Sequence, residues 1–220
     1  MSLKRIAHVF IRKVIKIFVI GIAGKTGSGK STAAGYLQSC LKDSLLIDGD
    51  KIAKEIYLSD RSAREQVRTC FGDFVLKADG QIDYRKLGKL VFSSKEKLCS
   101  LNDIMLPRIE SAVKEKLRLN TDKKYLIIDA AILFNTGIYK ICDFIIWVRA
   151  DRRRRQEMLA EKSGLTEDEI TLRVEGQMVK RIPSRIDFIL DNNGTVEEMQ
   201  DKINSIVANI GDTLNNKSIG

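Results

Sequence analysis

Short apolar runs alternate with amphipathic stretches along most of the chain, and this alternation predicts the elements and their packing. Runs in which nearly every residue is apolar are typical of strands that are buried on both faces. Such runs occupy residues 17–23, 45–48, 125–129, 144–148 and 186–191. Helical patterns separate them, so we expect a three-layer α/β/α fold in which helices cover both faces of a parallel five-stranded sheet.

The helical stretches between these runs are unequal in length. Residues 60–119 are helical in pattern with no strand among them, so we interpret them as an insertion into the sheet domain. Residues 152–181 form a long and highly charged helical segment. A last helix is predicted over 196–210, and we expect the polar tail at 211–220 to fray.

The first sixteen residues form a separate pattern, in which apolar residues recur at the spacing of one helix face. These residues are Leu3, Ile6, Ala7, Phe10, Ile11, Val14 and Ile15. Arg12 and Lys13 interrupt any secretory signal core. The pattern fits a short extra helix, an extension from an upstream start codon, an organellar presequence or a membrane-surface helix.

Charge is concentrated at the start of the chain. The 220 residues carry 38 Lys and Arg against 29 Asp and Glu, a net charge of +9, and residues 1–42 supply eight of these nine charges. Because the remaining 178 residues are nearly neutral, a nucleic-acid partner is not expected. The run Arg152–Arg155 is followed by five acids within 157–169, which indicates a solvated helix rather than a basic patch.

The single histidine and the scattered cysteines exclude several classes of enzyme. The single histidine, His8, precedes the first predicted strand. The chain therefore lacks the core histidine that Ser–His–Asp or Cys–His hydrolases use as a base and that most zinc sites use as a ligand. The four cysteines form no C-x-x-C pair, which is typical of reduced thiols inside a cell. No apolar run reaches the ~20 residues of a membrane span. We therefore predict a cytoplasmic protein, either a monomer or a weak homo-oligomer.

Residues 24–31, Gly-Lys-Thr-Gly-Ser-Gly-Lys-Ser, match the phosphate-loop pattern G-x-x-x-x-G-K-[ST] at every fixed position. They follow an apolar strand and precede a helix predicted to about Cys40, which is the context that this motif requires. Backbone N–H groups and the helix N-terminus can bind a polyphosphate there. Lys30 can reach its β- and γ-phosphates, and Ser31 can ligate Mg²⁺. The expected nucleotide contacts are Gly27, Ser28, Gly29, Lys30, Ser31 and Thr32.

Carboxylates follow the second and third predicted strands. Asp48 and Asp50 end or follow one strand and Asp129 ends the other, at the edge where parallel sheets bind ligands. One of the first pair could accept a proton from an attacking hydroxyl. Either could also cap the following helix, and both roles could hold at once. Asp129 could contact Mg²⁺ directly or through water. A GTPase of the common kind is excluded because N-K-x-D is absent.

Further segments complete an ordered set with this loop and the Asp48-Gly49-Asp50 triplet. They lie at residues 80–92, 101–107, 129–143, 164–177 and 187–194. Through this set, residues 17–210 resemble the dephospho-coenzyme A kinase family, of the nucleotide-monophosphate-kinase-like P-loop group. The resemblance implies ATP- and Mg²⁺-dependent phosphorylation of the ribose 3′-hydroxyl of dephospho-CoA, the last step of coenzyme A biosynthesis.

The resemblance also implies roles for individual residues. Asp50 would be the general base, Lys30 the catalytic cation and Asn193 a neighbour of the ATP adenine. The substrate would lie near Asp83, Arg85, Leu87, Phe92 and Asp129. In the family, lid arginines would stabilise the charge of the transferring phosphoryl group. The candidates for this role here are the cationic residues Arg152, Arg155 and Lys162.

Several positions depart from the family pattern. Tyr84 stands where the family usually has an Arg, and the adjacent Arg85 could substitute for it. Met158 and Lys162 stand where the family has two lid arginines. The other departures are Leu106 for His, Ala131 for Pro and Asn135 for Glu. They point to a divergent member or to an altered substrate preference.

Two other functions stay open. The loop also resembles that of uridine kinases, so a nucleoside kinase is one alternative. A nucleotide-dependent switch or nucleic-acid-binding ATPase is another, which the nearly neutral body and the paired carboxylates argue against. The expected organisation is an extension at 1–16, core segments at 17–59, 121–149 and 183–211, a substrate insertion at 60–120, a lid at 150–182 and a flexible tail at 212–220.

Overall fold

The computed structural model describes residues 17–176 and 185–217, with the side chains of 162, 163, 216 and 217 outside the description. The amphipathic helix predicted for residues 1–16 lies outside the described residues. So does the end of the helical segment predicted to residue 181.

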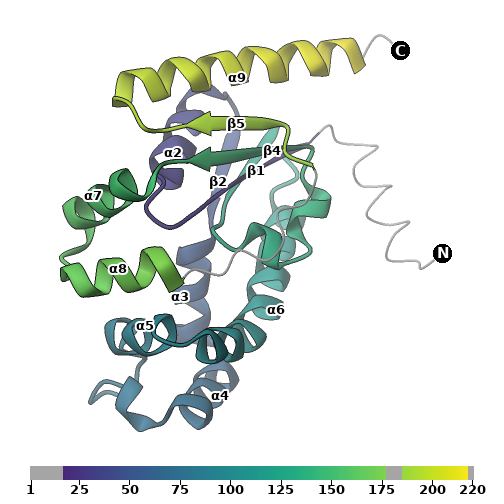
Figure 1. The fold of residues 1–220 in the computed structure, drawn as a ribbon. Coiled ribbons are helices and arrows are strands. Elements are labelled where there is room, and N and C mark those ends of the chain that lie inside the picture. The colour runs from purple at the N-terminus through teal and green to yellow at the C-terminus, as the bar shows by residue number, and fades with distance from the viewer. Residues whose placement is uncertain (1–16, 177–184, 218–220) are drawn as a thin grey trace.

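Five parallel strands form one sheet, which confirms the predicted fold (Figure 1). The strands are β1 (Phe18–Gly24), β2 (Ser44–Asp48), β3 (Tyr125–Asp129), β4 (Phe144–Arg149) and β5 (Phe188–Asp191), in the order β2-β3-β1-β4-β5. Asp48 is the register partner of Asp129, and Ile22 of β1 pairs with Asp129 from the other side. The carboxyl ends of β1, β2 and β3 therefore meet at one edge.

The sheet is buried on both faces because its strands are apolar at successive positions. In β1, Val19 and Ala23 belong to one core cluster, and Ile20 and Ile22 to the other. Helices α2 (Lys30–Cys40) and α9 (Val196–Lys217) cover the second cluster. Helices α3 (Gly49–Ser59) and α6 (Lys95–Leu119) cover the first.

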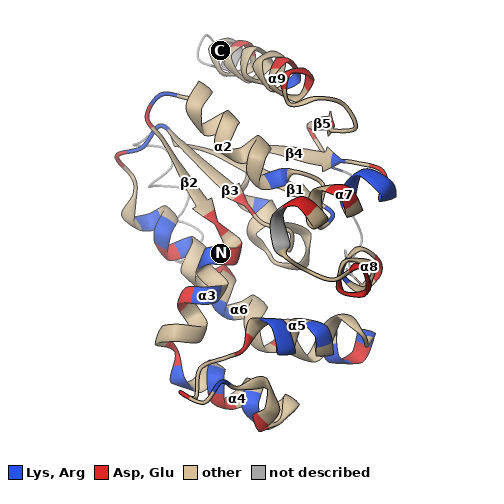
Figure 2. Ribbon diagram, turned by 90° about the vertical axis from the view of Figure 1, so that its left-hand side faces the viewer, with Lys and Arg blue, Asp and Glu red and all other residues tan. Residues whose placement is uncertain are grey.

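The insertion continues away from the sheet. Helices α4 (Arg61–Phe71), α5 (Tyr84–Phe92) and the first turns of α6 extend below the strands in Figure 1, with the 3-10 helix η1 (Asp73–Val75) between α4 and α5. Two further 3-10 helices, η2 (Leu133–Asn135) and η3 (Ile138–Ile141), connect β3 to β4. Figure 2 shows basic and acidic residues mixed along α3, α4 and α7, in keeping with the nearly neutral body of the chain.

The charged segment after β4, which the pattern predicted to be helical, consists of two helices within the described residues. Helix α7 (Arg152–Ser163) ends at Gly164, whose φ of 56° is left-handed, and α8 (Glu167–Gly176) starts after Thr166. The backbone N–H and the hydroxyl of Thr166 both donate to Glu169, and the N–H of Glu169 donates back to the hydroxyl of Thr166. This capping box fixes a new helix start that the charge pattern did not reveal.

The last helix also differs from its prediction. Helix α9 extends to Lys217, past the expected end at residue 210 and into the predicted tail. Gly211 does not break it, because Leu214 lies one turn after Ile210 and packs against the same core cluster. Helix packing therefore overrides the weak propensity of one glycine.

No helix within residues 17–176 and 185–217 is long and apolar enough to cross a membrane.

Candidate active site

The phosphate loop joins β1 to α2 at the centre of the sheet. Gly27 and Gly29 have φ of 78° and 86°, a left-handed conformation that side-chain-bearing residues rarely adopt. Gly29 is the N-cap of α2, and the first turn of that helix holds no acidic residue. The loop's backbone N–H groups and the positive end of α2 therefore face the same anion-binding space.

Two buried side chains hold this loop from outside. The Nε of Arg155 donates to the carbonyl of Thr26 at 2.8 Å, and Nδ2 of Asn192 donates to the carbonyl of Ser28 at 2.9 Å. A Cβ on Gly27 would lie 2.5 Å from the Arg155 carbonyl oxygen, and one on Gly29 would lie 2.2 Å from Asn192 Nδ2. Both glycines are thus required by close packing as well as by φ.

Lys30 lies where the loop meets α2, and its Nζ donates to the carbonyl of Lys25 at 3.4 Å. Burial lowers the pKa of Lys30 below its ordinary value, while the nearby carboxylates of Asp129 and Asp50 act in the opposite direction. The ammonium group therefore stands between the loop and the carboxylates of neighbouring strands.

The three carboxylates occupy different environments. Asp48 is the cap: its Oδ1 accepts from the N–H groups of Asp50 at 2.9 Å and Lys51 at 3.1 Å. Asp50 is exposed in the first turn of α3, so helix capping does not occupy it. Asp129 is buried, which raises its pKa despite a hydrogen bond from the Ser31 hydroxyl and attraction to Lys30.

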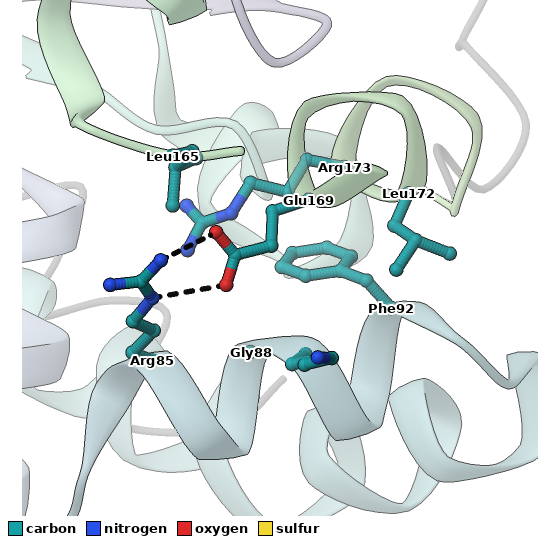
Figure 3. Close-up of a pocket in the computed structure, with 8 residues that line it drawn as sticks. Arg85, Gly88, Phe92, Leu165, Glu169, Leu172 and Arg173 are labelled. Carbon is teal, nitrogen blue, oxygen red and sulfur yellow. Dashed lines mark hydrogen bonds and ion pairs between the residues drawn. The ribbon is translucent and has the colours of Figure 1, made fainter. Parts of the chain in front are cut away.

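Four of the five predicted substrate residues lie on α5 or cap it, whereas Asp129 ends β3, and the structure brings only some of them to one surface. Asp83 caps α5 by accepting from the N–H groups of Arg85 and Lys86, and Leu87 is part of the core. Arg85 and Phe92 border a narrow pocket between α5 and α8 (Figure 3). Its other lining residues are Gly88, Lys89, Leu165, Glu169, Leu172 and Arg173.

Arg173 is the functional candidate that sequence reasoning missed. Its guanidinium lies over the ring of Phe92, 5.6 Å from the centroid, and is attracted to both Glu169 and Asp50. Burial lowers its pKa below the ordinary value, and attraction to the two carboxylates acts in the opposite direction. The available signal was the i, i+4 spacing of Glu169 and Arg173, which puts both on one helix face.

The predicted lid residues are dispersed. Arg152 is exposed and pairs with Glu175, whereas Arg155 is buried and donates from Nη2 to the carbonyl of Val174 at 3.0 Å as well as to Thr26. Lys162 lies in α7, and its side chain is outside the described residues. Met158 reaches the loop, with Sδ 4.0 Å from Asn192 Nδ2.

Asn193 is oriented by the protein itself. Its Oδ1 accepts from the N–H of Asp151 at 2.8 Å, and its Nδ2 donates to Asp191 at 2.7 Å. The side chain thus joins the turn after β5 to the start of α7. Its neighbour Asn192 contacts the phosphate loop instead.

Three further departures from the family pattern lie in two places. The Tyr84 ring packs against that of Tyr57, 5.6 Å between centroids, so position 84 helps to pack α5 against α3. Leu106 and Asn135 border one groove between α6 and η2. These two replacements are therefore neighbours in space although they are far apart in sequence.

Comparisons with known proteins agree on one family. A family model described as dephospho-CoA kinase matches residues 18–198. The chain is 33% identical over 199 residues to a dephospho-CoA kinase of Corynebacterium glutamicum, covering 89% of this chain and 98% of that one. It is 34% identical over 191 residues to one of Fusobacterium nucleatum, covering 86% and 96%.

Solved structures show the same fold. The structure of TT1252 from Thermus thermophilus aligns with a TM-score of 0.65 at 26% identity, covering 87% of this chain and 97% of that one. A dephospho-CoA kinase from Campylobacter jejuni aligns with a TM-score of 0.52 at 19% identity, covering 89% and 98%.

Proposed function

The chain belongs to the dephospho-CoA kinase family, and on this premise we propose that its site transfers the γ-phosphoryl group of ATP to the ribose 3′-hydroxyl of dephospho-CoA. The reaction gives CoA and ADP and is the last step of coenzyme A biosynthesis. The observation that carries the proposal is the gathering of Lys30, Asp50 and Asp129 beside the phosphate loop, at the carboxyl ends of adjacent strands.

The loop and Lys30 bind the donor. Backbone N–H groups of residues 27–32 hold the phosphates, and Lys30 places a positive charge beside the β- and γ-phosphates. Binding a polyanion favours the charged form of Lys30, which opposes the effect of burial on its pKa.

Asp50 is the proposed general base. Because Asp48 already caps α3, the Asp50 carboxylate remains available to accept the proton of the attacking 3′-hydroxyl. The Asp50 carboxylate is attracted to the cations Lys30 and Arg173, which would also attract the negatively charged γ-phosphoryl group. The proton moves from the hydroxyl to this carboxylate as the new P–O bond forms.

The residues present fit a magnesium ion bound with ATP. The Ser31 hydroxyl follows the loop lysine and donates to the buried carboxylate of Asp129, an all-oxygen pair of the kind Mg²⁺ prefers. Ser31 would hold the ion and Asp129 would reach it through water. When bound, the ion would neutralise charge on the phosphates.

Arg173 supplies the charge that Met158 lacks. Of the guanidiniums considered as lid candidates, Arg152 is paired on the surface and Arg155 is bonded to two carbonyls. Arg173 of α8 lies over the ring of Phe92 and is attracted to the Asp50 carboxylate. We assign it the stabilisation of the transferring phosphoryl group.

We also propose a role for each segment of the chain, the cellular location of the enzyme and its oligomeric state. Segments 17–59, 121–149 and 183–211 bind ATP, the insertion at 60–120 binds dephospho-CoA, and 150–182 acts as a lid that excludes water. Asn193 shapes the turn beside which the adenine is expected. The enzyme acts in the cytoplasm as a monomer or weak homo-oligomer without nucleic acid, in keeping with its nearly neutral body.

The test is an ATP-consumption assay with dephospho-CoA, uridine and shikimate as separate acceptors. We expect turnover with dephospho-CoA alone, and Asp50→Asn should lower kcat by about 10²- to 10⁴-fold while ATP binding is retained. Asp122→Asn, which changes an exposed carboxylate paired with its neighbour Lys123, is the matched control. Turnover with another acceptor and none with dephospho-CoA would reject the substrate, and an active Asp50→Asn enzyme would reject the base.

A further inference from the structure

The ion pair between Arg85 of α5 and Glu169 of α8 joins the insertion to the lid. We propose that this pair, the Arg85–Glu169 latch, positions Arg173 over Phe92 at the contact between α5 and α8, from where its charge serves phosphoryl transfer. The inference rests on the proposed function of the site, but it assigns Arg85 to the lid rather than to the substrate. Arg85 and Glu169 are both positioning residues, since they act through Arg173.

The latch has the geometry of a strong ion pair. Nε of Arg85 donates to Oε1 of Glu169 at 3.0 Å, and Nη2 donates to Oε2 at 3.0 Å, so the contact is bidentate (Figure 3). The Glu169 side chain is only 10% exposed. The two residues are 84 positions apart in sequence, so the pair fixes the distance between two separate parts of the molecule.

The same carboxylate also begins helix α8. It accepts from the N–H of Thr166 at 3.0 Å and from its hydroxyl at 3.3 Å, in addition to both Arg85 contacts. Docking of α8 on α5 and formation of the first turn of α8 therefore depend on one group. These contacts also lower the pKa of Glu169 to about 2, so the latch is fully charged at neutral pH.

Arg173 lies one turn beyond Glu169 on the same helix face. The latch brings that face against α5, where the guanidinium lies over Phe92 and attraction extends to Asp50. The approach is close: a Cβ on Gly88 would lie 3.3 Å from Arg173 Nη2, and one on Gly176 would lie 2.6 Å from the carbonyl oxygen of Phe92. Loss of the latch would leave α8 bonded to Arg155 through the Val174 carbonyl but would loosen its contact with α5, so that Arg173 shifts from its position over Phe92.

If Arg85 instead contacted the substrate directly, the loss of kcat on replacing Arg85 would not depend on Glu169. A double-mutant cycle separates the two roles. Glu169→Gln keeps an acceptor for the Thr166 cap, since Gln serves in a capping box, but removes the charge. Arg85→Met keeps the apolar stem and removes the guanidinium.

With dephospho-CoA and ATP, each single variant should lower kcat by roughly tenfold, as expected for loss of a charged hydrogen-bonded pair. KM for ATP should change less than about twofold, and Arg85→Lys should recover part of the loss. The Arg85→Met/Glu169→Gln double variant should be no worse than either single one. Adding Glu169→Gln to Arg173→Met should cost almost nothing further. Additive losses, about 100-fold in the double variant, would overturn the latch.

Hydrogen exchange of the backbone of α8 tests the latch without turnover. In the enzyme without ligands, Arg85→Met and Glu169→Gln should both accelerate exchange over residues 167–176. Glu115→Gln, which removes a bidentate partner of Arg118 on α6, should change neither exchange nor kcat. Unaltered exchange in Arg85→Met would overturn the proposal. Wild-type enzyme that does not phosphorylate dephospho-CoA would reject the proposed function instead, and the exchange result would still decide the latch.

Discussion

Arg173 is the residue whose removal should be most informative after Asp50. Arg173→Met should lower kcat by about 10³-fold, because a lid guanidinium in related phosphoryl-transfer sites contributes that much. KM for ATP should change far less, since we propose that the loop and Lys30 bind the donor. Arg173→Lys should recover only part of the rate, because an ammonium group cannot reproduce the planar fork.

Steady-state kinetics of these variants beside Arg153→Met provides the comparison. The Arg153 side chain is 89% exposed on α7 and pairs with Glu157 of the same helix, so its loss should leave kcat unchanged. Equal losses of kcat in Arg173→Met and Arg153→Met would show that Arg173 has no specific role in phosphoryl transfer.

The titration of Glu169 predicts how stability depends on pH. Its pKa is lowered from 4.5 to about 2 in the folded protein, so the unfolded chain takes up the proton first as the pH falls. The contribution to stability is therefore complete above about pH 4.5 and is lost between that pH and about pH 2. Wild type should be more stable than Glu169→Gln at pH 7, and the difference should shrink across this window. Urea unfolding of both proteins at pH 7 and pH 3 measures it, and a difference that grows on acidification would contradict the sign.

At the level of elements, two strands begin with the same device. Asp143 and Asp187 each precede a phenylalanine that starts a strand, and each carboxylate accepts from the backbone N–H of the neighbouring strand, Val19 or Ile145, at 2.8 Å. Each aspartate thus bonds the neighbouring strand through its carboxylate as well as through its own N–H, one residue before its strand begins.

The device has a measurable effect on stability. Asp187→Ala should destabilise the protein by about 1–3 kcal/mol, because the N–H of fully buried Ile145 loses its acceptor. Asp187→Asn keeps an acceptor and should lose less. Chemical denaturation compares the two variants, and equal losses would show that charge rather than the hydrogen bond matters.

Elements that depend on local pattern were predictable, and those that depend on distant contacts were not. The five apolar runs and the phosphate loop specify their conformation within a few residues, so the sheet and the loop followed from the sequence. The split between α7 and α8 was present locally in Gly164 and the Thr166–Glu169 box but was hidden by the charge pattern. The extension of α9 depends on Leu214 meeting a core that no local rule describes.

The candidate site divides in the same way. Lys30, Ser31 and the aspartates at strand ends are recognisable because motif and topology bring them together. Asn192, Arg155 and Arg173 act through partners more than 100 residues away or on another helix, and no spacing rule relates them. Asn193 and Arg85 were selected by position in a motif, and the structure gives each a protein partner.

At the scale of the whole molecule, the site should link nucleotide binding to stability. ATP with Mg²⁺ at 100 times its Kd should stabilise the fold by about 2.7 kcal/mol and raise Tm. Lys30→Met should abolish most of this shift while the ligand-free Tm changes little, because burial disfavours the charged lysine in the empty site. A thermal melt with and without nucleotide measures both quantities. A full shift in Lys30→Met would show that Lys30 takes no part in nucleotide binding.

Arg155 joins two parts of this site through one guanidinium, bonded to Thr26 in the phosphate loop and to Val174 in α8. A movement of either part is therefore transmitted to the other. If α8 closes over the acceptor, as we propose for the lid, then that closure and occupation of the loop by the donor are coupled equilibria. By reciprocity, each ligand should change the affinity for the other by the same factor, so that the order in which they arrive does not alter their combined affinity.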